Sequence, residues 1–200
     1  VPLFILSGQI MNSGGFAGRL IQFAKTLVGF LPGGLALINI ISAMLMGSIS
    51  GSAMASASAM GSVLGPEMEK EGYSKDFGVA VNITSATTGL IIPPSNVLIV
   101  YSLASGGVSV GALFLAGYIP GILTGLLLML VALFWSKKNK YKVGNRSTLK
   151  EIMASFFYAI PSLFLLIIII GGIISGIFTA TEASAIAVLY SIILGFIYKE

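Results

Sequence analysis

The sequence predicts an all-α polytopic membrane protein, and its composition and charge pattern are the evidence. Of its 200 residues, 56% are hydrophobic and 9% are charged, and the mean hydropathy is +1.00. A soluble domain carries about 25% charged residues to cover its surface. The two longest stretches without a charged residue are residues 26–66 and residues 77–136, and their lengths are 41 and 60 residues. Since one spanning helix needs about 20 apolar residues, we expect several membrane crossings.

The residue types that are missing exclude several kinds of chemistry. The sequence contains no cysteine and no histidine, so it offers no disulfide, no thiolate ligand and no imidazole base. It also lacks the glycine-rich phosphate-binding loop that nucleotide-driven proteins use. We therefore expect neither an enzyme nor a protein with an organic cofactor.

The net charge of +4 is concentrated in one short segment. Six of the eleven basic residues lie there: Lys137, Lys138, Lys140, Lys142, Arg146 and Lys150. Basic residues directly after an apolar helix mark the cytoplasmic side of a membrane protein. We therefore expect residues 136–151 to form a basic cytoplasmic loop. The partner that this charge predicts is a lipid bilayer, not a nucleic acid.

Residues 1–32 are predicted to hold the end of a transmembrane helix and then an amphipathic surface helix. Within residues 14–31, Arg19, Gln22 and Lys25 follow one another at a spacing of three, with apolar residues on the other faces. This pattern is typical of a helix that lies along a membrane surface. A plain cytoplasmic linker is the alternative. The sequence opens without a methionine or a charged leader, so we interpret it as an internal part of a longer protein.

Residues 33–66 are predicted to form a helical hairpin. Its arms, residues 34–46 and 53–65, hold 13 residues each, or about 20 Å of helix, which is less than the ~30 Å of a bilayer core. The turn at residues 47–52 contains only glycine and serine apart from Ile49. These features favour a re-entrant hairpin whose tip lies at membrane depth, buried in protein or lining a watery cavity. Two full spanning helices with an external turn are the alternative.

Residues 75–135 are predicted to form a broken transmembrane helix followed by an unbroken one. Polar and β-branched residues fill positions 82–89, and two consecutive prolines follow. Prolines lack an N–H donor and clash with the preceding turn, so a continuous helix cannot pass through them. We expect a half-helix that ends near Thr84, an unwound stretch, and a second half-helix from Pro94 to about Ser105.

Three unbroken spanning helices are expected in all: the one just named, at residues 109–135, and two within residues 152–200, at 152–175 and 183–198. Taking the basic loop as cytoplasmic fixes the direction of each helix by counting crossings. The count places the charged turn at residues 67–76 in the cytoplasm as well.

Glu182 stands directly before the last of these helices, behind Thr179 and Thr181. We expect its carboxylate to cap the start of the helix, where it also interacts favourably with the helix dipole. A proton or cation relay inside the membrane is the alternative.

The hairpin turn and the broken helix carry the strongest functional signal. Secondary transporters build ion and substrate sites where helices are interrupted near the bilayer midplane. Freed carbonyls and hydroxyls ligate a hard cation there, and helix N-termini attract an anion. The groups available are the hydroxyls of Ser48, Ser50, Ser52, Thr84, Ser85, Thr87 and Thr88, and the backbone of Gly51 and Gly89. The alternative is structural, because rows of small residues such as Gly47, Gly51, Ala55 and Ala59 also let helices pack closely.

Short motifs along the chain resemble those of one family of membrane proteins. They are Gly8 and residues 33–36, 47–53, 72–73, 91–95, 115–121, 176–179 and 181–183. In order and spacing they resemble the large membrane (permease) subunit of the tripartite ATP-independent periplasmic (TRAP) transporters, of the dicarboxylate or sialic-acid type. The resemblance implies a multi-pass protein of the bacterial plasma (inner) membrane.

For the fold, the resemblance implies the first inverted repeat of an elevator-type ion-coupled transporter, with a re-entrant helical hairpin and a broken transmembrane helix. Residues 33–66 are then the first hairpin, residues 82–95 the first unwound helix, and residues 152–200 the opening of the second repeat. The second hairpin and its sodium site are expected to lie outside this chain.

For the function, the resemblance implies a sodium-driven symporter that imports an organic acid anion, either a C4-dicarboxylate or a sugar acid. Sodium is its coupling ion, and its partners are a small four-helix membrane subunit and an extracytoplasmic solute-binding protein. We expect sodium to be bound by Ser50, Gly51, Ser52, Ser85, Thr87 and Gly89. We expect the substrate to be bound by Ser52, Thr88, Pro94 and Ser95.

The chain departs from the family pattern at three positions. Ser56 stands where many relatives carry an acidic residue, and Leu90 and Ala180 stand where many carry proline. Two other functions remain open. One is a stand-alone sodium–dicarboxylate symporter, which shares the hairpin and broken helix but needs no binding protein. The other is a non-transporting membrane scaffold, in which the small residues only pack helices.

Overall fold

The computed structural model describes residues 2–13 and 15–198, and every regular element in this part of the chain is a helix. The elements are α1 (Pro2–Ser13), α2 (Phe16–Val28), α3 (Gly34–Ser50), α4 (Ala53–Lys70), α5 (Lys75–Ala86), the 3-10 helix η1 (Thr87–Leu90), α6 (Asn96–Ala104), α7 (Val110–Lys138), α8 (Leu149–Ile174) and α9 (Ala180–Tyr198). Among the described residues, α7, α8 and α9 are long and apolar enough to cross a membrane. The all-α and membrane predictions are confirmed.

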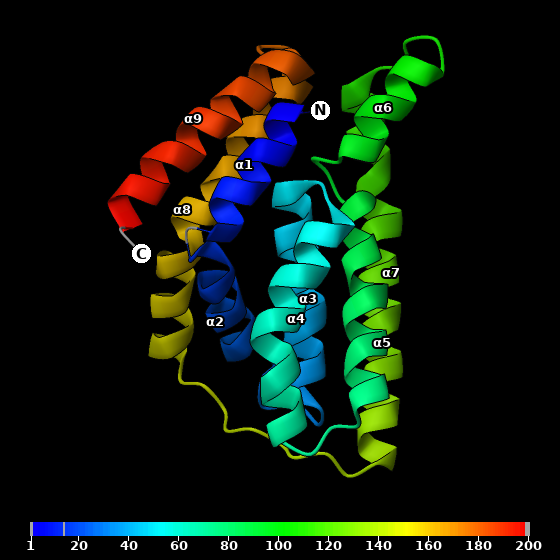
Figure 1. Cartoon of the computed structure of the whole chain (residues 1–200), viewed down its shortest axis with the longest axis vertical. Coiled ribbons are helices and arrows are strands. Elements are labelled where there is room, and N and C mark those ends of the chain that lie inside the picture. Colours follow the sequence, from blue (N-terminus) through cyan, green and yellow to red (C-terminus); the bar gives the residue numbers. More distant parts are fainter. Residues whose placement is uncertain (1, 14, 199–200) are drawn as a thin grey trace.

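The hairpin of α3 and α4 stands in the middle of the molecule (Figure 1). On one side α2 packs against both α3 and α8, and α1 packs against α9. On the other side α5, η1 and α7 pack against α3. Leu37, Ile40 and Met46 of α3 are almost fully buried, so α3 is the axis around which the other helices are arranged.

The arms of the hairpin are longer and its turn is shorter than the sequence predicted. α3 has 17 residues and α4 has 18, or about 26 and 27 Å of helix, where 13 residues each were expected. Helix α3 continues through the predicted turn because its backbone hydrogen bonds continue: the N–H of Gly51 still donates to the carbonyl of Gly47, at 2.7 Å. Only Gly51 and Ser52 connect the helices. The tip lies below the upper ends of α6, α7 and α8 in Figure 1, and its depth in a bilayer stays a prediction.

The broken helix is confirmed, with boundaries that differ from the prediction by two residues. Helix α5 ends at Ala86 instead of Thr84, because η1 tightens its last turn before the chain unwinds. Helix α6 begins at Asn96 instead of Pro94. Ser95 is the N-cap, and its Oγ accepts a hydrogen bond from the N–H of Leu98 at 3.4 Å. A serine side chain supplies this acceptor and a proline does not.

Helices α8 and α9 both begin three residues earlier than predicted, and both begin with a Thr-x-x-Glu capping box. At α8 the carboxylate of Glu151 accepts from the N–H of Thr148 at 2.7 Å. At α9 Glu182 Oε2 accepts from both the N–H and the hydroxyl of Thr179, each at 2.8 Å. The capping role predicted for Glu182 is confirmed. The threonine that caps each helix sets its first residue.

Helix α2 is amphipathic, and its apolar face is buried against α3 and α8. Phe16, Leu20 and Ala24 on this face are fully buried. The guanidinium of Arg19 lies over the rings of Tyr158 and Tyr198, with 3.9 and 3.4 Å from its carbon to the ring centroids. The predicted helix is therefore present over Phe16–Val28. Its position along a membrane surface stays a prediction, and Gly14, where it was expected to begin, lies outside the described residues.

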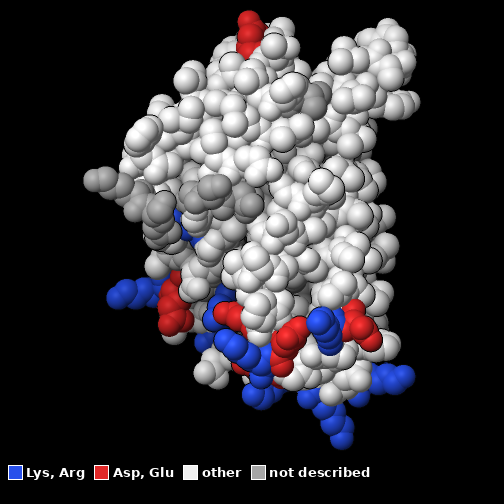
Figure 2. Space-filling view, viewed as in Figure 1, with Lys and Arg blue, Asp and Glu red and all other residues white. Residues whose placement is uncertain are grey.

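Charged side chains gather at one end of the molecule, over the ends of α4 and α5 and the loop at residues 139–148 (Figure 2). The crossing count requires the charged turn and the basic loop to lie on the same side, and they do: Lys142 Nζ lies 3.6 Å from Glu71 Oε2. The N–H of Ser74 donates to the hydroxyl of Tyr141 at 3.2 Å. That this end is cytoplasmic stays a prediction.

Four stacked aromatic rings join the charged turn to the end of α7. The ring centroids of Tyr73 and Tyr141 are 4.2 Å apart, and those of Phe77 and Trp135 are 6.0 Å apart. Tyr73 is 6% exposed, and burial, which disfavours the phenolate, raises its pKa to about 12. The turn between α4 and α5 is thereby held against α7.

The basic loop continues along the base of the hairpin beyond this aromatic contact. Val143 pairs with Pro32 in an antiparallel bridge. Gly144 lies against the backbone of Gly29, where an added Cβ would come within 2.4 Å of the carbonyl oxygen. Arg146 lies over the ring of Phe30, 5.7 Å from its centroid. Most of the loop therefore packs against the segment that directly precedes α3.

Candidate ion and substrate site

The two polar breaks meet in the folded chain. Gly47 of α3 packs directly on Gly89 of η1, because a Cβ built on either residue would lie 2.4 Å from the Cα of the other. One turn further along α3, Gly51 lies against Asn96, and a Cβ on Gly51 would lie 3.1 Å from the backbone nitrogen of Asn96. The hairpin tip and the unwound part of the helix therefore form one structure, which we call the joint (residues 47–52 and 85–96).

The hairpin tip is a tight turn held by its own polar groups. Gly51 has φ +60°, a conformation that glycine adopts without steric cost. The hydroxyl of Ser50 donates to the carbonyl of Ser52 and accepts from the N–H of Ser52, both at 3.3 Å. Gly8 of α1 covers the tip, because a Cβ on it would lie 2.8 Å from that of Ser50. Ser50 and Gly51 are buried and Ser52 is half-buried.

The N-termini of two helices lie beside each other at the joint. Ser52 caps α4, and its Oγ accepts from the N–H of Ala55 at 3.3 Å. Ser95 caps α6, and the next residue, Asn96, contacts Gly51, which directly precedes Ser52. Each helix N-terminus carries a partial positive charge and unpaired N–H groups. Together they favour an anion near Ser52 and Ser95.

Asn96 bridges the two breaks through its side chain. Its Nδ2 donates to the carbonyl oxygens of Ser50 and Gly51, at 3.4 Å in each case. Its Oδ1 is buried and has no hydrogen-bond partner within the described residues. The sequence prediction placed the start of the half-helix at Pro94 and did not assign Asn96 to the site. An amide directly after a serine that can cap a helix is the sequence signal that could have identified Asn96.

Three of the hydroxyls in the break are buried and donate to oxygen acceptors. Ser85 Oγ donates to Asn39 Oδ1 at 3.1 Å, Thr88 Oγ1 donates to the carbonyl of Ser85 at 2.6 Å, and Ser95 Oγ donates to the carbonyl of Leu90. All three residues are fully buried. A hydroxyl that donates its proton keeps oxygen lone pairs available, so these oxygens are suited to a cation.

Not every predicted residue joins this group. Thr87 is exposed at the surface of the described chain, and its Oγ1 donates to the carbonyl of Thr84 at 2.7 Å.

Of the six predicted sodium ligands, the structure brings together Ser50, Gly51, Ser52 and Gly89 at the joint, with Ser85 one turn below Gly89. Of the predicted substrate residues, Ser52, Pro94 and Ser95 lie at the helix N-termini. Thr88, the fourth predicted substrate residue, is fully buried.

Two amides that the sequence prediction did not assign to the site join α5 to the hairpin. Asn39 of α3 is 1% exposed and accepts from Ser85. Asn82 of α5 donates from Nδ2 to the carbonyl of Ala57 in α4 at 2.8 Å. A cavity of about 290 Å³ between α3, α4 and α5 is lined by both amides. An isolated asparagine in an apolar stretch is the signal that marks Asn39.

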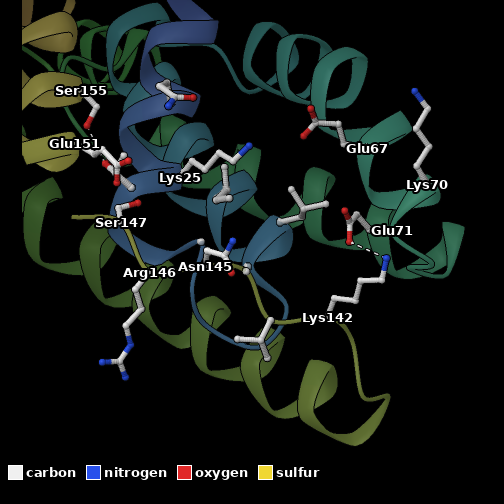
Figure 3. A pocket seen from close by; sticks show the side chains of 18 of the residues that line it. Lys25, Glu67, Lys70, Glu71, Lys142, Asn145, Arg146, Ser147, Glu151 and Ser155 are labelled. Atoms are coloured by element: carbon white, nitrogen blue, oxygen red, sulfur yellow. Dashed lines mark hydrogen bonds and ion pairs between the residues drawn. The ribbon is translucent and has the colours of Figure 1, made fainter.

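A larger cavity, of about 1080 Å³, lies at the charged end of the molecule and not at the joint. Residues of α2, α3, α4, α8 and the basic loop line it, and Figure 3 shows Lys25 and Glu67 facing the space from opposite sides. On its wall Thr26 of α2 and Ser155 of α8 share a hydrogen bond of 2.8 Å between their hydroxyls. Charges of both signs surround this cavity.

Known proteins match the chain over its full length. The family model for the DctM component of the tripartite ATP-independent periplasmic transporters matches residues 1–200. The uncharacterized protein YgiK of Salmonella typhimurium is 58% identical over 200 residues, which cover 100% of this chain and 46% of that protein.

Two further relatives carry functional names. The C4-dicarboxylate TRAP transporter large permease protein DctM of Pseudomonas aeruginosa is 43% identical over 201 residues, covering 100% of this chain and 47% of that protein. The sialic acid TRAP transporter large permease protein SiaM of Vibrio cholerae is 41% identical over 195 residues, covering 98% and 45%. These two relatives are transporter permeases and not enzymes, as expected.

The chain spans about half the length of the curated relatives it matches. It belongs to the family of the DctM component, the large permease protein of the tripartite ATP-independent periplasmic transporters.

Proposed function

We propose that this chain is part of the large membrane subunit of a sodium-driven secondary transporter in the bacterial inner membrane, and that it holds most of the first repeat. The subunit imports an organic acid anion, a C4-dicarboxylate or a sugar acid, which an extracytoplasmic binding protein delivers. A small four-helix membrane subunit assembles with it. The names of the relatives from Pseudomonas aeruginosa and Vibrio cholerae support this substrate class.

The observation that carries the proposal is the contact between the two polar breaks. Gly47 meets Gly89, and Gly51 meets Asn96, so an interrupted hairpin and an interrupted helix share one buried, oxygen-rich place. Sodium is bound there by carbonyl and hydroxyl oxygens of Ser50, Gly51, Ser52, Ser85 and Gly89. Thr87, which is exposed, contributes only if η1 rearranges.

The substrate carboxylate binds next to the ion, at the N-termini of α4 and α6. Ser52 and Ser95 cap these helices, and the free N–H groups and dipoles there attract negative charge. A sodium ion beside the carboxylate strengthens its binding by direct attraction in a site of low dielectric. Each ligand therefore favours the binding of the other, which is what ion coupling requires.

Transport proceeds by rigid-body movement of the part that carries the re-entrant hairpin, as in an elevator mechanism. The sodium gradient drives this movement. In Figure 1 the joint lies part of the way between the upper and lower ends of the long helices α7 and α8. A site at such a position can face each side of the membrane in turn.

Reconstitution tests the proposal. The full-length protein and its small subunit are placed in vesicles, and uptake of radiolabelled C4-dicarboxylate or sialic acid is measured with an imposed sodium gradient. We expect uptake only when both sodium and the cognate binding protein are present. Uptake without the binding protein would instead identify a stand-alone symporter, and uptake that ignores sodium would contradict ion coupling. A membrane scaffold would give no uptake.

A further inference from the structure

Among the described residues of the joint, Asn96 has the one buried polar side chain whose hydrogen bonding is left half complete. Its Nδ2 donates to two carbonyls, yet its Oδ1 is buried and lacks a partner within the described residues. A buried acceptor without a partner carries the full penalty of its lost hydration. A bound ion is one of the partners that account for such a group. The following inference rests on the proposed sodium coupling.

The two ends of an asparagine amide have the same shape and opposite chemistry. Rotation by half a turn about the last side-chain bond exchanges the donor nitrogen and the acceptor oxygen, and the surrounding hydrogen bonds decide which orientation is favoured. In this structure the nitrogen faces the carbonyl oxygens of Ser50 and Gly51. With a cation between these carbonyls, the oxygen of Asn96 has to face them instead.

The distances from the amide to the two carbonyl oxygens suit such a cation. Asn96 Nδ2 lies 3.4 Å from the oxygens of both Ser50 and Gly51, longer than the ~2.9–3.0 Å of an ordinary N–H···O bond. A hard cation with oxygen ligands at about 2.3–2.6 Å separates neighbouring ligands at right angles by about 3.3–3.7 Å. Sodium has nearly the radius of calcium. The Asn96 amide therefore stands at the distance from both carbonyls that a third oxygen ligand of sodium would have.

We propose that Asn96 is a sodium ligand that changes the orientation of its amide when the ion binds. Without sodium, Nδ2 holds the hairpin tip through the carbonyls of Ser50 and Gly51. With sodium, the amide turns, and Oδ1 binds the ion together with the same two carbonyls. Because Asn96 is the first residue of α6, the ion then connects the hairpin tip directly to the N-terminus that faces the substrate carboxylate.

Two substitutions at this position separate an oxygen ligand from an amide donor. Asn96→Leu removes both groups at nearly constant size. Asn96→Asp keeps an oxygen and removes the N–H donor. An ion ligand tolerates the aspartate and fails with the leucine, whereas a group that acts only as a donor fails with both, because the aspartate oxygens repel the two carbonyls.

The experiment measures the melting temperature of the purified full-length protein against sodium chloride concentration, with choline chloride keeping the ionic strength constant. Sodium that binds the folded state raises the melting temperature. We expect Asn96→Leu to raise the half-saturating sodium concentration at least about 10-fold, on the order of effects seen when support for a metal is removed. We expect Asn96→Asp to melt lower than the wild type in choline, and to regain stability at an equal or lower sodium concentration.

Asn139→Asp is the matched control, since this amide is exposed at the end of α7, where its Nδ2 donates to the carbonyl of Trp135 at 2.9 Å. It should leave the half-saturating sodium concentration unchanged. If the leucine variant does not fold, Asn96→Ala takes its place. A leucine or alanine variant with the wild-type sodium response, or an aspartate variant as weak as either, would overturn the role of Asn96 alone. A wild-type protein that ignores sodium would overturn sodium coupling and this role together.

Discussion

Gly47 of α3 and Gly89 of η1 touch backbone to backbone, with no room for a side chain on either residue. Through this contact the unwound end of α5 rests on the hairpin one turn below its tip. The groups that we propose for sodium and substrate are arranged around it.

Substitution of Gly89 by alanine should push η1 away from α3, because the added Cβ would come within 2.4 Å of the Cα of Gly47. We expect a loss of about 1–3 kcal/mol in the free energy of unfolding, typical of overpacking, and a weaker rise of the melting temperature with sodium. Gly65→Ala is the control, because nothing lies within 4 Å of its added Cβ and alanine is the better helix former. Thermal unfolding of the full-length protein measures both effects. If both substitutions lower the melting temperature equally, the contact between Gly47 and Gly89 is not important for stability.

Substitution of Ser52 by alanine tests binding separately from helix capping. Ser52 caps α4 at the joint, and Ser109 caps α7 in an exposed position with the same bond length, 3.3 Å to the N–H of Ala112. Both Ser52→Ala and Ser109→Ala should lose about 0.5–2 kcal/mol of stability. Only Ser52→Ala should raise the sodium concentration for half-maximal uptake in vesicles. Equal uptake parameters in the two variants would favour the scaffold interpretation, in which these serines serve structure alone.

Ser85 and Thr87 are two residues apart and differ in burial. Ser85 is fully buried and donates to Asn39, whereas Thr87 is exposed. We expect Ser85→Ala to weaken sodium-dependent uptake about 10-fold or more, because it removes a proposed ligand. Thr87→Ala should have a clearly smaller effect, and sodium titration of uptake measures both. The reverse order would show that η1 rearranges when sodium binds and brings Thr87 inward.

Ionisation of Tyr73 should destabilise the charged end at high pH. Burial raises its pKa to about 12 from the ordinary 10.0. The neutral phenol therefore contributes its full stability below pH 10, and this contribution is lost as the pH rises from 10 toward 12, where the unfolded chain ionises first. The melting temperature should fall over this range, and Tyr73→Phe should reduce the fall. The near-ultraviolet titration of phenolate should lose its component at highest pH in the same variant.

The sequence was sufficient to locate the broken helix and the start of α9 because the causes of both are local. Pro93 and Pro94 interrupt a helix in any surroundings, and the Thr179–Glu182 pair caps one wherever it stands. The extent of the hairpin turn was not predictable in this way. Residues 47–50 are poor helix formers in water, yet they remain helical here, because a backbone surrounded by apolar partners has no other acceptor for its hydrogen bonds.

The contacts that assemble the site depend on tertiary structure and left little trace in the sequence. The packing of Gly47 on Gly89 requires two segments to meet that are 42 positions apart. The position of Asn96 depends on which of three consecutive residues, Pro94, Ser95 or Asn96, begins α6, and the cap formed by Ser95 decides it. A register error of two residues therefore removed Asn96 from the predicted site.

The loop between α7 and α8 is short, and most of it is attached to the hairpin. Residues 139–148 would reach about 33 Å if fully extended. Tyr141, Lys142, Val143 and Arg146 are attached to the base of the hairpin. Only residues 147 and 148, about 7 Å of extended chain, then remain before α8 begins at Leu149. The proposed movement of the hairpin past α8 is therefore limited by these two residues, and a longer movement requires residues 141–146 to detach from the hairpin base.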